Sequence, residues 1–229
     1  MNKVWYLSQI NIFEGMNNED MIEINLLDAI NHFNWFPKNT LVQTPGKVRE
    51  GLFFVKEGKL KLYMLNERGK KITLDILERG NLFGELNSFS LGTKRVYIET
   101  MESSLICSLS EDQFKKLMIH RPQLAQKLIK ILSDRLKERD DQLEKLAIHG
   151  LRTRVLHLFC TLSVKFGVIR EGDVLINLAL PQEEIANMLC ASQEAVSGVM
   201  NELVNDGIIK TSHMSVLLSK TMLENKFHE

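Results

Sequence analysis

The stretch from Leu180 to Lys210 reads LPQEEIANMLCASQEAVSGVMNELVNDGIIK, and it gives the clearest structural signal in the chain. Apolar residues recur at helical spacing on both sides of a short break at Cys190-Ala191-Ser192. Ser192 is a good N-cap for the second helix, and Gly207 provides the positive φ that ends it. Two short helices joined by a three-residue turn predict a helix-turn-helix, whose second helix would enter the major groove of DNA.

The flanking residues agree with this interpretation. Ile208-Ile209-Lys210 and Val216-Leu217-Leu218 are separated by a polar turn, so they predict a small hairpin, or wing. A helix opens at Arg152-Thr153-Arg154, and a hairpin across 167–178 follows with its turn at 170–173. An ordinary helical hairpin packed in a core is the alternative, but the caps, the short turn and the following hairpin together favour the helix-turn-helix.

These residues also carry a family resemblance. Glu184-Ile185-Ala186, Ser192 to Ser197, and Leu203 through Gly207 to Ile209 resemble the DNA-binding end of the Crp/Fnr family of bacterial transcription regulators. The resemblance extends over nearly the whole chain. It implies an effector-sensing domain in the first half and a long dimerisation helix in the middle.

Composition is that of a soluble globular protein. The 229 residues are 44% hydrophobic and 25% charged, with a formal net charge of zero that neither supports nor excludes a nucleic-acid partner. No apolar run approaches a membrane span and no signal peptide is evident, so we expect a cytoplasmic protein without a membrane partner. Cys107, Cys160 and Cys190 are far apart and suggest neither a disulfide framework nor a zinc site.

The first half predicts a β structure behind an N-terminal helix. Residues 1–35 look helical, and after Pro37 apolar and polar residues alternate at 59–64 and 72–76. Further strands are expected at 96–101 and 104–109. Glycine turns separate the strands and favour an antiparallel sandwich or barrel, similar to the β-roll of the family. The residues that mark the helix are Met21, Ile24, Leu26, Leu27 and Ile30.

The expected fold is therefore α+β, in three parts. Residues 1–120 form an antiparallel β-roll of the cyclic-nucleotide-binding type, 121–150 a dimerisation helix, and 151–229 a winged helix-turn-helix.

Within the β-roll, residues 81–86 resemble the phosphate-binding segment of the family. Gly84 lets backbone N–H groups approach an anion, and the resemblance implies that Glu85 holds a ribose hydroxyl. The Arg-Ser pair that holds the phosphate in cyclic-AMP-binding members aligns with Lys94-Arg95, so the serine is absent and the arginine is replaced or shifted by one. A turn that only supports the scaffold is the alternative function of Gly84 and Glu85.

The middle of the chain predicts two helices. Ser110 is a plausible N-cap for a helix at 111–119, and Pro122 fits the first turn of a long helix that runs to about Gly150. That helix packs on its own β domain or forms a parallel two-stranded coil. Its seam follows a heptad pattern at Ala125, Ile129, Leu132, Leu136, Leu143 and Leu146.

Arg139 breaks that seam. It aligns with a threonine that contacts adenine in cyclic-AMP receptors, and Asp140 replaces the serine beside it, so the adenine contacts are absent. We hypothesise that Arg139 and Arg95 serve a different, anionic effector at the subunit boundary. A salt bridge from Arg139 to Asp140, Asp141 or Glu144 is the alternative.

No resident cofactor is expected, although an unidentified small-molecule effector is compatible with the sequence. Iron–sulfur members need N-terminal cysteines, whereas the first cysteine here is Cys107. The six histidines repeat no ligand spacing, so His32, His120, His149 and His157 are interpreted as surface or structural residues. Cys190 is most simply a small buried apolar residue.

The outer face of the second helix carries the candidate base readers. Gln193 can pair with adenine and Glu194 can accept from a cytosine amino group, and Ser197 and Asn201 share their face. Ser192 and Lys210 complete the predicted DNA-binding set. The family usually places an arginine where Gln193 stands and another where Gly198 stands.

The charge of the C-terminal part is low for a DNA-binding domain. Residues 151–229 hold seven basic and nine acidic residues, a net charge of −2. Arg152, Arg154, Lys210 and backbone N–H groups are the expected phosphate contacts.

The leading interpretation is a homodimeric, sequence-specific regulator of transcription that reads a two-fold symmetric double-stranded DNA site. Its effector is neither cyclic AMP nor an iron–sulfur cluster, or it needs none, and RNA polymerase is a further candidate partner. The alternative is a sensor or protein-interaction module whose helix-turn-helix does not read DNA. An enzyme is not expected, because no nucleophile–base pair, metal-ligand spacing or phosphate-binding glycine loop is present.

Overall fold

The computed structural model describes residues 11–13, 33–212 and 214–219. They form two compact units: the described residues up to Leu65 together with 73–138 make up the first, and 66–72 together with those from Arg139 onward make up the second. Of the helix expected at 1–35, most lies outside the described residues, including all five apolar residues that mark it. A short 3₁₀ helix, η1 (Asn11–Phe13), is described, and Ile12 and Phe13 are fully buried.

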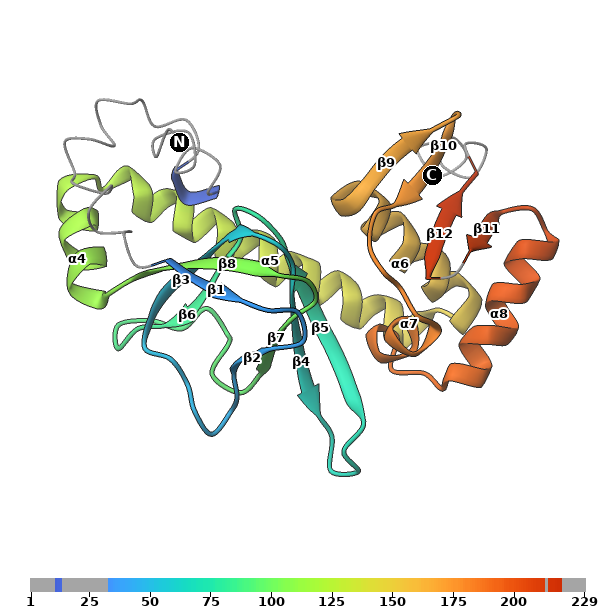
Figure 1. Cartoon of the computed structure of the whole chain (residues 1–229), viewed down its shortest axis with the longest axis horizontal. Helices are drawn as coiled ribbons and strands as arrows, with labels where there is room; N and C mark the ends of the chain where they lie inside the picture. Colours follow the sequence, from blue (N-terminus) through green and yellow to red (C-terminus); the bar gives the residue numbers. More distant parts are fainter. Residues whose placement is uncertain (1–10, 14–32, 213, 220–229) are drawn as a thin grey trace. The chain divides into compact units, whose positions relative to one another are not determined.

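The first unit is built from two antiparallel four-stranded sheets (Figure 1). One sheet has the order β1-β8-β3-β6 and the other the order β2-β7-β4-β5. The β-roll expected from the alternating pattern and the glycine turns is therefore confirmed. The strands are β1 (Phe33–Phe36), β2 (Leu41–Gln43), β3 (Gly51–Glu57), β4 (Leu60–Leu65), β5 (Lys71–Leu77), β6 (Leu82–Glu85), β7 (Tyr97–Thr100) and β8 (Ser104–Leu109).

The C-terminal end predicted for the N-terminal helix is wrong. Residues 33–35, which were included in the predicted helix, lie instead in strand β1, where Asn34 pairs with Ile106 and Trp35 with Leu105. The partner strand lies about seventy residues further along the chain, so local periodicity does not reveal it. Aromatic residues favour strands, which is consistent with the outcome.

Apolar side chains fill the space between and beside the sheets. Phe53 and Phe83 stack with ring centroids 5.2 Å apart in a cluster that also holds Ile98. A second cluster is covered by α4 (Glu111–His120) and the start of α5 (Gln123–Ile148). Ser110 and Gln113 form a capping box at the start of α4, as the N-cap prediction implies.

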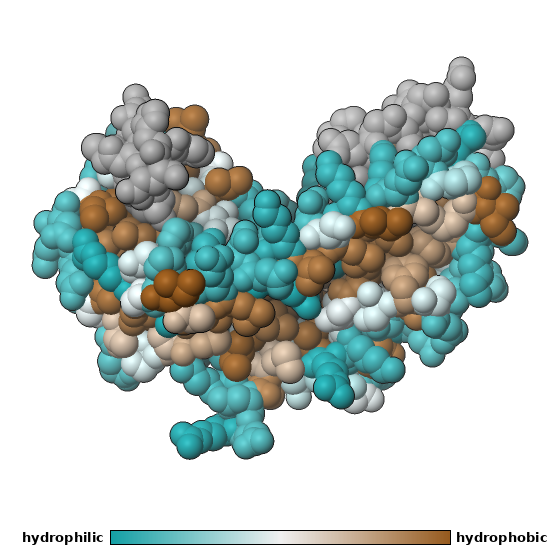
Figure 2. All heavy atoms as spheres, turned by 180° about the vertical axis from the view of Figure 1, so that it is seen from behind, coloured by the Kyte–Doolittle hydropathy of each residue, from teal (hydrophilic) through white to brown (hydrophobic). Residues whose placement is uncertain are grey.

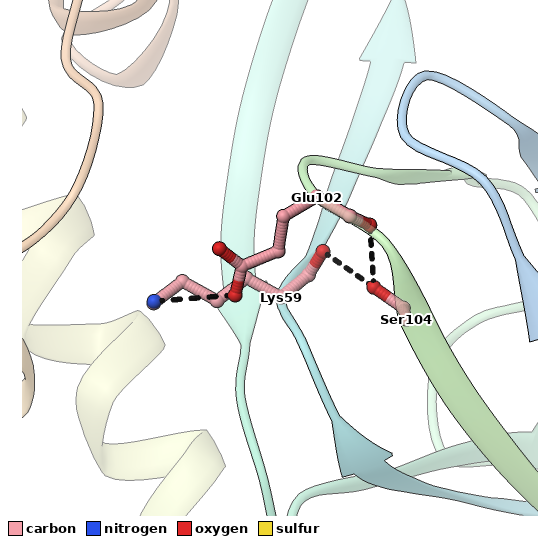
Figure 3. A network of polar contacts seen from close by, with 3 residues as sticks. All are labelled: Lys59, Glu102 and Ser104. Carbon is pink, nitrogen blue, oxygen red and sulfur yellow. Dashed lines mark hydrogen bonds and ion pairs between the residues drawn. The ribbon is translucent and has the colours of Figure 1, made fainter.

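A small polar network ties the β3–β4 turn to the β7–β8 turn (Figure 3). The Lys59 ammonium lies 3.4 Å from Glu102 Oε1, and the Ser104 hydroxyl donates to the Glu102 carbonyl at 2.8 Å. Gly58 precedes this network with φ +90°, and a Cβ there would collide with Ser104 Oγ and lie 2.8 Å from Ser103 O. The close approach of the two turns therefore requires glycine at position 58.

The second unit is a winged helix-turn-helix, as predicted (Figure 1). Its four-stranded sheet has the order β11-β12-β10-β9, and the β9–β10 hairpin turns through Glu171 and Gly172, both with positive φ. This pair of φ values is typical of a type I′ turn. The elements are α6 (Leu151–Phe166), β9 (Gly167–Arg170), β10 (Asp173–Ile176), α7 (Gln182–Met188), α8 (Gln193–Asn205), β11 (Ile209–Ser212) and β12 (Ser215–Leu218).

Helix α5 carries two apolar stripes. Leu124 and Leu128 are buried against the β-roll, and Leu132 packs against the same cluster. Two other seam residues, Ile129 and Leu136, are 63% and 62% exposed. Figure 2 shows brown patches of apolar residues between teal hydrophilic ones on one face of the molecule. Of the two uses of the helix that the sequence left open, packing on the β domain is therefore observed, and the two-stranded coil stays a prediction.

Replacing Gly58 with alanine should destabilise the first unit strongly. Alanine would adopt a left-handed conformation and also meet the backbone of Ser103, so we expect a loss of about 2–4 kcal/mol in the free energy of unfolding. Gly69→Ala is the matched control, because Gly69 has φ +73° but nothing within 4 Å of a Cβ. Urea unfolding of both variants measures the difference. Equal losses would contradict the predicted collision.

Candidate functional site

The inner face of α8 fixes the orientation of this helix. Val196, Met200 and Leu203 are buried at 0%, 5% and 0% exposure, in a unit where α8 packs against α6, α7 and β11. The three residues recur at spacings of four and three, so they lie on one side of the helix. The opposite side of α8 is therefore presented outward.

Both ends of α8 are capped, as the sequence predicts. The Ser192 hydroxyl accepts from the Ala195 N–H at 3.2 Å. At the other end, Gly207 has φ +70°, its N–H donates to Val204 O at 3.0 Å, and the Ile208 N–H donates to Leu203 O at 3.0 Å. This pair of bonds is a Schellman motif. Local capping thus fixes the helix from Gln193 to Asn205.

The turn before α8 corrects one expectation. Cys190 was expected to be buried, but it is exposed and has φ +51°. The chain reverses there within a few residues, because the Ala191 N–H returns to Ala186 O at 3.0 Å. The left-handed backbone at this point directs the Cys190 side chain outward. Cys190 is therefore part of the turn and does not pack in the core.

The candidate base readers lie where the sequence places them. Gln193, Glu194 and Asn201 are exposed, and Ser197 is half-buried. At about 100° per residue, these four positions span one side of α8. Ser192 is exposed at the start of the helix, and Lys210 is exposed on the neighbouring strand β11. Their DNA contacts remain predictions.

The three side chains expected to bind phosphates already form ion pairs or hydrogen bonds with other residues of the second unit. Arg152 pairs with Asp206 at 2.6 Å and with Glu202 at 3.4 Å, and Arg154 donates to the Leu189 carbonyl. Lys210 pairs with Asp173 at 3.0 Å. Acidic neighbours therefore offset two of the three cations.

Residues 81–86, the segment expected to bind an effector, contain strand β6. Gly84 is buried with φ +133°, and a Cβ there would collide with Gly51 O and approach Phe53 Cδ2 to 3.1 Å. Strand β3 lies directly opposite, with Leu52 paired to Gly84. Glycine is therefore required at this position by the approach of two backbones, whatever else it does.

Glu85 is held by a residue that sequence reasoning did not single out. Thr93, 1% exposed, donates from its N–H and from its hydroxyl to Glu85 Oε1, each at 2.8 Å. The Thr93 hydroxyl also accepts from the Gly84 N–H at 3.2 Å, and buried Gln43 donates to Thr93 O at 2.6 Å. An anion that approaches the Gly84 N–H would have to displace the Thr93 hydroxyl.

The remaining effector candidates are exposed. Lys94 and Arg95 follow Thr93 directly, and their side chains point to solvent while that of Thr93 points inward. Arg139 is also exposed, and within the described part of the chain it forms no ion pair with Asp140, Asp141 or Glu144. Sequence reasoning also missed Arg135, which donates from α5 to the Leu82 carbonyl of β6 at 2.5 Å.

Helix α4 fixes the loop after β6. The Glu111 carboxylate accepts from the Asn87 N–H at 3.0 Å and from the Asn87 side chain at 2.8 Å. Lys115 bonds the same carboxylate, and its hydrogen bond, followed by that of the Asn87 N–H, lowers the pKa of Glu111. The loop therefore stays tied to α4 while Glu111 is ionised. Burial raises the pKa of the Cys107 thiol on β8 to about 12, which makes it unreactive.

No group of three metal-ligating side chains is found among the residues that the structure describes. No helix in the same part of the chain is long and apolar enough to cross a membrane.

Comparisons with known proteins agree with this arrangement. The model of a cyclic nucleotide-binding domain matches residues 33–121, and that of a Crp-like helix-turn-helix domain matches 153–225. The "CRP-like cAMP-activated global transcriptional regulator" of Mycobacterium tuberculosis is 27% identical over 184 residues, 80% of this chain and 82% of that protein. The "Probable transcriptional regulator flp" of Lacticaseibacillus casei is 26% identical over 205 residues, 90% of each chain.

Solved structures show the same fold. A mutant of CooA from Carboxydothermus hydrogenoformans matches with a TM-score of 0.74 and 25% identity, and the match covers 89% of each chain. The c-di-GMP-responsive global regulator CLP of Xanthomonas campestris matches with a TM-score of 0.72 over 88% of this chain and 99% of that one, at 21% identity.

The β-roll of the cyclic-nucleotide-binding type, the long helix and the winged helix-turn-helix together define a Crp-like transcription regulator that binds DNA. The chain belongs to the Crp/Fnr family. Members of this family are regulators of transcription and not enzymes.

Two glycines at α8 should respond to alanine in opposite directions. Neither has an atom within 4 Å of a Cβ, but Gly198 lies inside the helix whereas Gly207 has φ +70°. We expect Gly198→Ala to raise the free energy of unfolding by about 1 kcal/mol and Gly207→Ala to lower it by about 1 kcal/mol. Chemical denaturation of both variants measures this. Two changes of the same sign would contradict the assigned backbone conformations.

Proposed function

We propose that the chain acts as a homodimer that reads a two-fold symmetric DNA site through the outward face of α8. The supporting observation is the second apolar stripe of α5. Ile129, Leu136 and Leu143 recur every seven residues and are 63%, 62% and 64% exposed. A heptad repeat of this kind is the seam of a two-stranded coil, and a second copy of α5 would bury it. Two copies would place two recognition helices on half-sites about 34–36 Å apart.

The proposed base readers are Gln193 and Glu194 at the N-terminal end of α8, with Ser197 and Asn201 further along. Residues in the first turns of a recognition helix are the ones that reach base edges. Ser192 and the backbone N–H groups beside it would contact a phosphate, as would Lys210 once DNA competes with Asp173.

We further propose that the β-roll senses a small anion that carries a hydroxyl group. Thr93 donates both of its hydrogen bonds to Oε1 of Glu85. The other carboxylate oxygen, Oε2, forms no hydrogen bond with the described residues. It can therefore accept a hydrogen bond from a ligand hydroxyl. The exposed Lys94 and Arg95 would provide positive charge. The serine and threonine that bind cyclic AMP in other members are absent, which favours a different effector.

The effector proposal is tested by thermal unfolding with a panel of small phosphates, carboxylates and nucleotides. At least one should raise the melting temperature of the wild type, and Arg95→Ala should abolish that shift, because a ligand that binds only the folded state stabilises it. Lys38→Ala, which removes an exposed lysine outside the segment, is the control. If no anion stabilises the protein, the proposal is contradicted.

The dimer is tested by Leu136→Glu. A glutamate in the seam should convert the protein to a monomer in analytical ultracentrifugation and weaken DNA binding, since a buried unpaired charge is costly. Val164→Glu is the matched control, because Val164 lies on α6 and is 81% exposed but is not part of the seam. If both variants sediment as the wild type does, the stripe of α5 is not the interface.

Base reading is tested by selecting bound duplexes from a random DNA pool, with and without added metabolite extract. We expect a two-fold symmetric motif to be enriched, and Gln193→Ala and Glu194→Ala to change or abolish the enriched bases. Lys165→Ala, on α6, is the control. No enrichment under either condition would favour the alternative, a module that does not read DNA.

Two of the three cations expected to contact phosphates are paired with carboxylates, so we expect the affinity for DNA to depend only weakly on salt concentration. Because Arg152 and Lys210 are paired with carboxylates, we expect the log–log slope of affinity against salt to be much shallower than the value of about −10 found for strong phosphate binders. Fluorescence anisotropy with the selected duplex measures the slope. A slope as steep as about −10 would show that many more phosphates are contacted.

A further inference from the structure

Gly198 has no structural reason to be glycine. It lies in the interior of α8 and is exposed, and its φ is not positive. A Cβ built there meets nothing within 4 Å. By contrast, Gly58 and Gly84 are required by nearby atoms, and Gly207 by its φ. Glycine is the least favourable residue in a helix interior after proline, so this position lowers stability without any benefit inside the chain.

Its position on the helix indicates where the benefit lies. Gly198 is four residues after Glu194 and three residues before Asn201, so all three share one face and Gly198 lies between the other two. Val196, Met200 and Leu203 occupy the opposite side. The residue without a side chain thus lies on the outward side of α8, next to Glu194 and Asn201 of the face proposed to read DNA. Local rules of sequence are often broken at functional positions.

We propose that Gly198 is a specificity-determining residue, because its missing side chain leaves a notch between Glu194 and Asn201 that admits the 5-methyl group of a thymine. This inference rests on the proposed DNA-reading function of α8. A thymine would be recognised because it can approach the helix backbone closely at Gly198, a position where the family usually has an arginine.

The chemistry of the notch selects this group. The helical backbone at Gly198 offers apolar Cα hydrogens, and its N–H and C=O groups are used within the helix. A phosphate is disfavoured beside the Glu194 carboxylate. Among the groups that line the major groove, the thymine methyl is the apolar one. Flanking hydrogen bonds from Glu194 and Asn201 would then fix the neighbouring bases.

The test is Gly198→Ala, with the selected duplex as the probe. The variant should be more stable than the wild type and yet bind this duplex roughly tenfold more weakly, because the added methyl group fills the notch. Asn205→Ala is the matched control: it also improves helix propensity, but it lies in the last turn of α8, so its affinity should equal that of the wild type. If Gly198→Ala binds as tightly as the wild type or more tightly, the inference is overturned.

Replacing thymines of the duplex one at a time by uracil removes only the methyl group. Wild-type affinity should fall severalfold at one position in each half-site, and Gly198→Ala should be insensitive to that replacement. If the wild type tolerates every replacement, the assignment to thymine is wrong. A pool that yields no enriched duplex contradicts the proposed function itself, an outcome distinct from a duplex that both proteins bind equally.

Discussion

The burial of one side of a helix, with the other side left exposed, governs both units of this protein. Helix α5 buries Leu124 and Leu128 on the β-roll and leaves Ile129, Leu136 and Leu143 exposed. Helix α8 buries Val196, Met200 and Leu203 and exposes a polar face. In each helix the buried stripe supplies stability, and the exposed stripe is free for a partner. An apolar exposed stripe suits a second copy, whereas a polar one suits base edges.

The features set by local sequence were predictable. Ser192, Gly207 and Ser110 act as caps through bonds to residues a few positions away, so their effect can be inferred from spacing alone. The β9–β10 turn was likewise found from Glu171 and Gly172. In such cases the chemistry of one residue determines the backbone of its neighbours, and no distant contact intervenes.

The features that failed or were missed depend on distant partners. Strand β1 begins at Phe33 because it pairs with β8, and the pairing of Arg152 with Glu202 and Asp206 joins residues some fifty positions apart. Thr93 reaches Glu85 only because the loop between them folds back on β6. The exposure of Cys190 follows from a left-handed turn that its chemistry does not suggest. Fold and candidate faces were thus predictable, but the internal use of the charged and polar groups was not.

The proposed function depends most on two α8 helices reading DNA together at a fixed separation. The most direct measurement is the affinity of the wild type for the selected duplex, compared with one in which about five base pairs are inserted between the half-sites. That insertion turns one half-site to the opposite side of the double helix, because a turn is about 10.5 base pairs. We predict that binding falls to that of a single half-site. Equal affinity for the two duplexes would contradict the account.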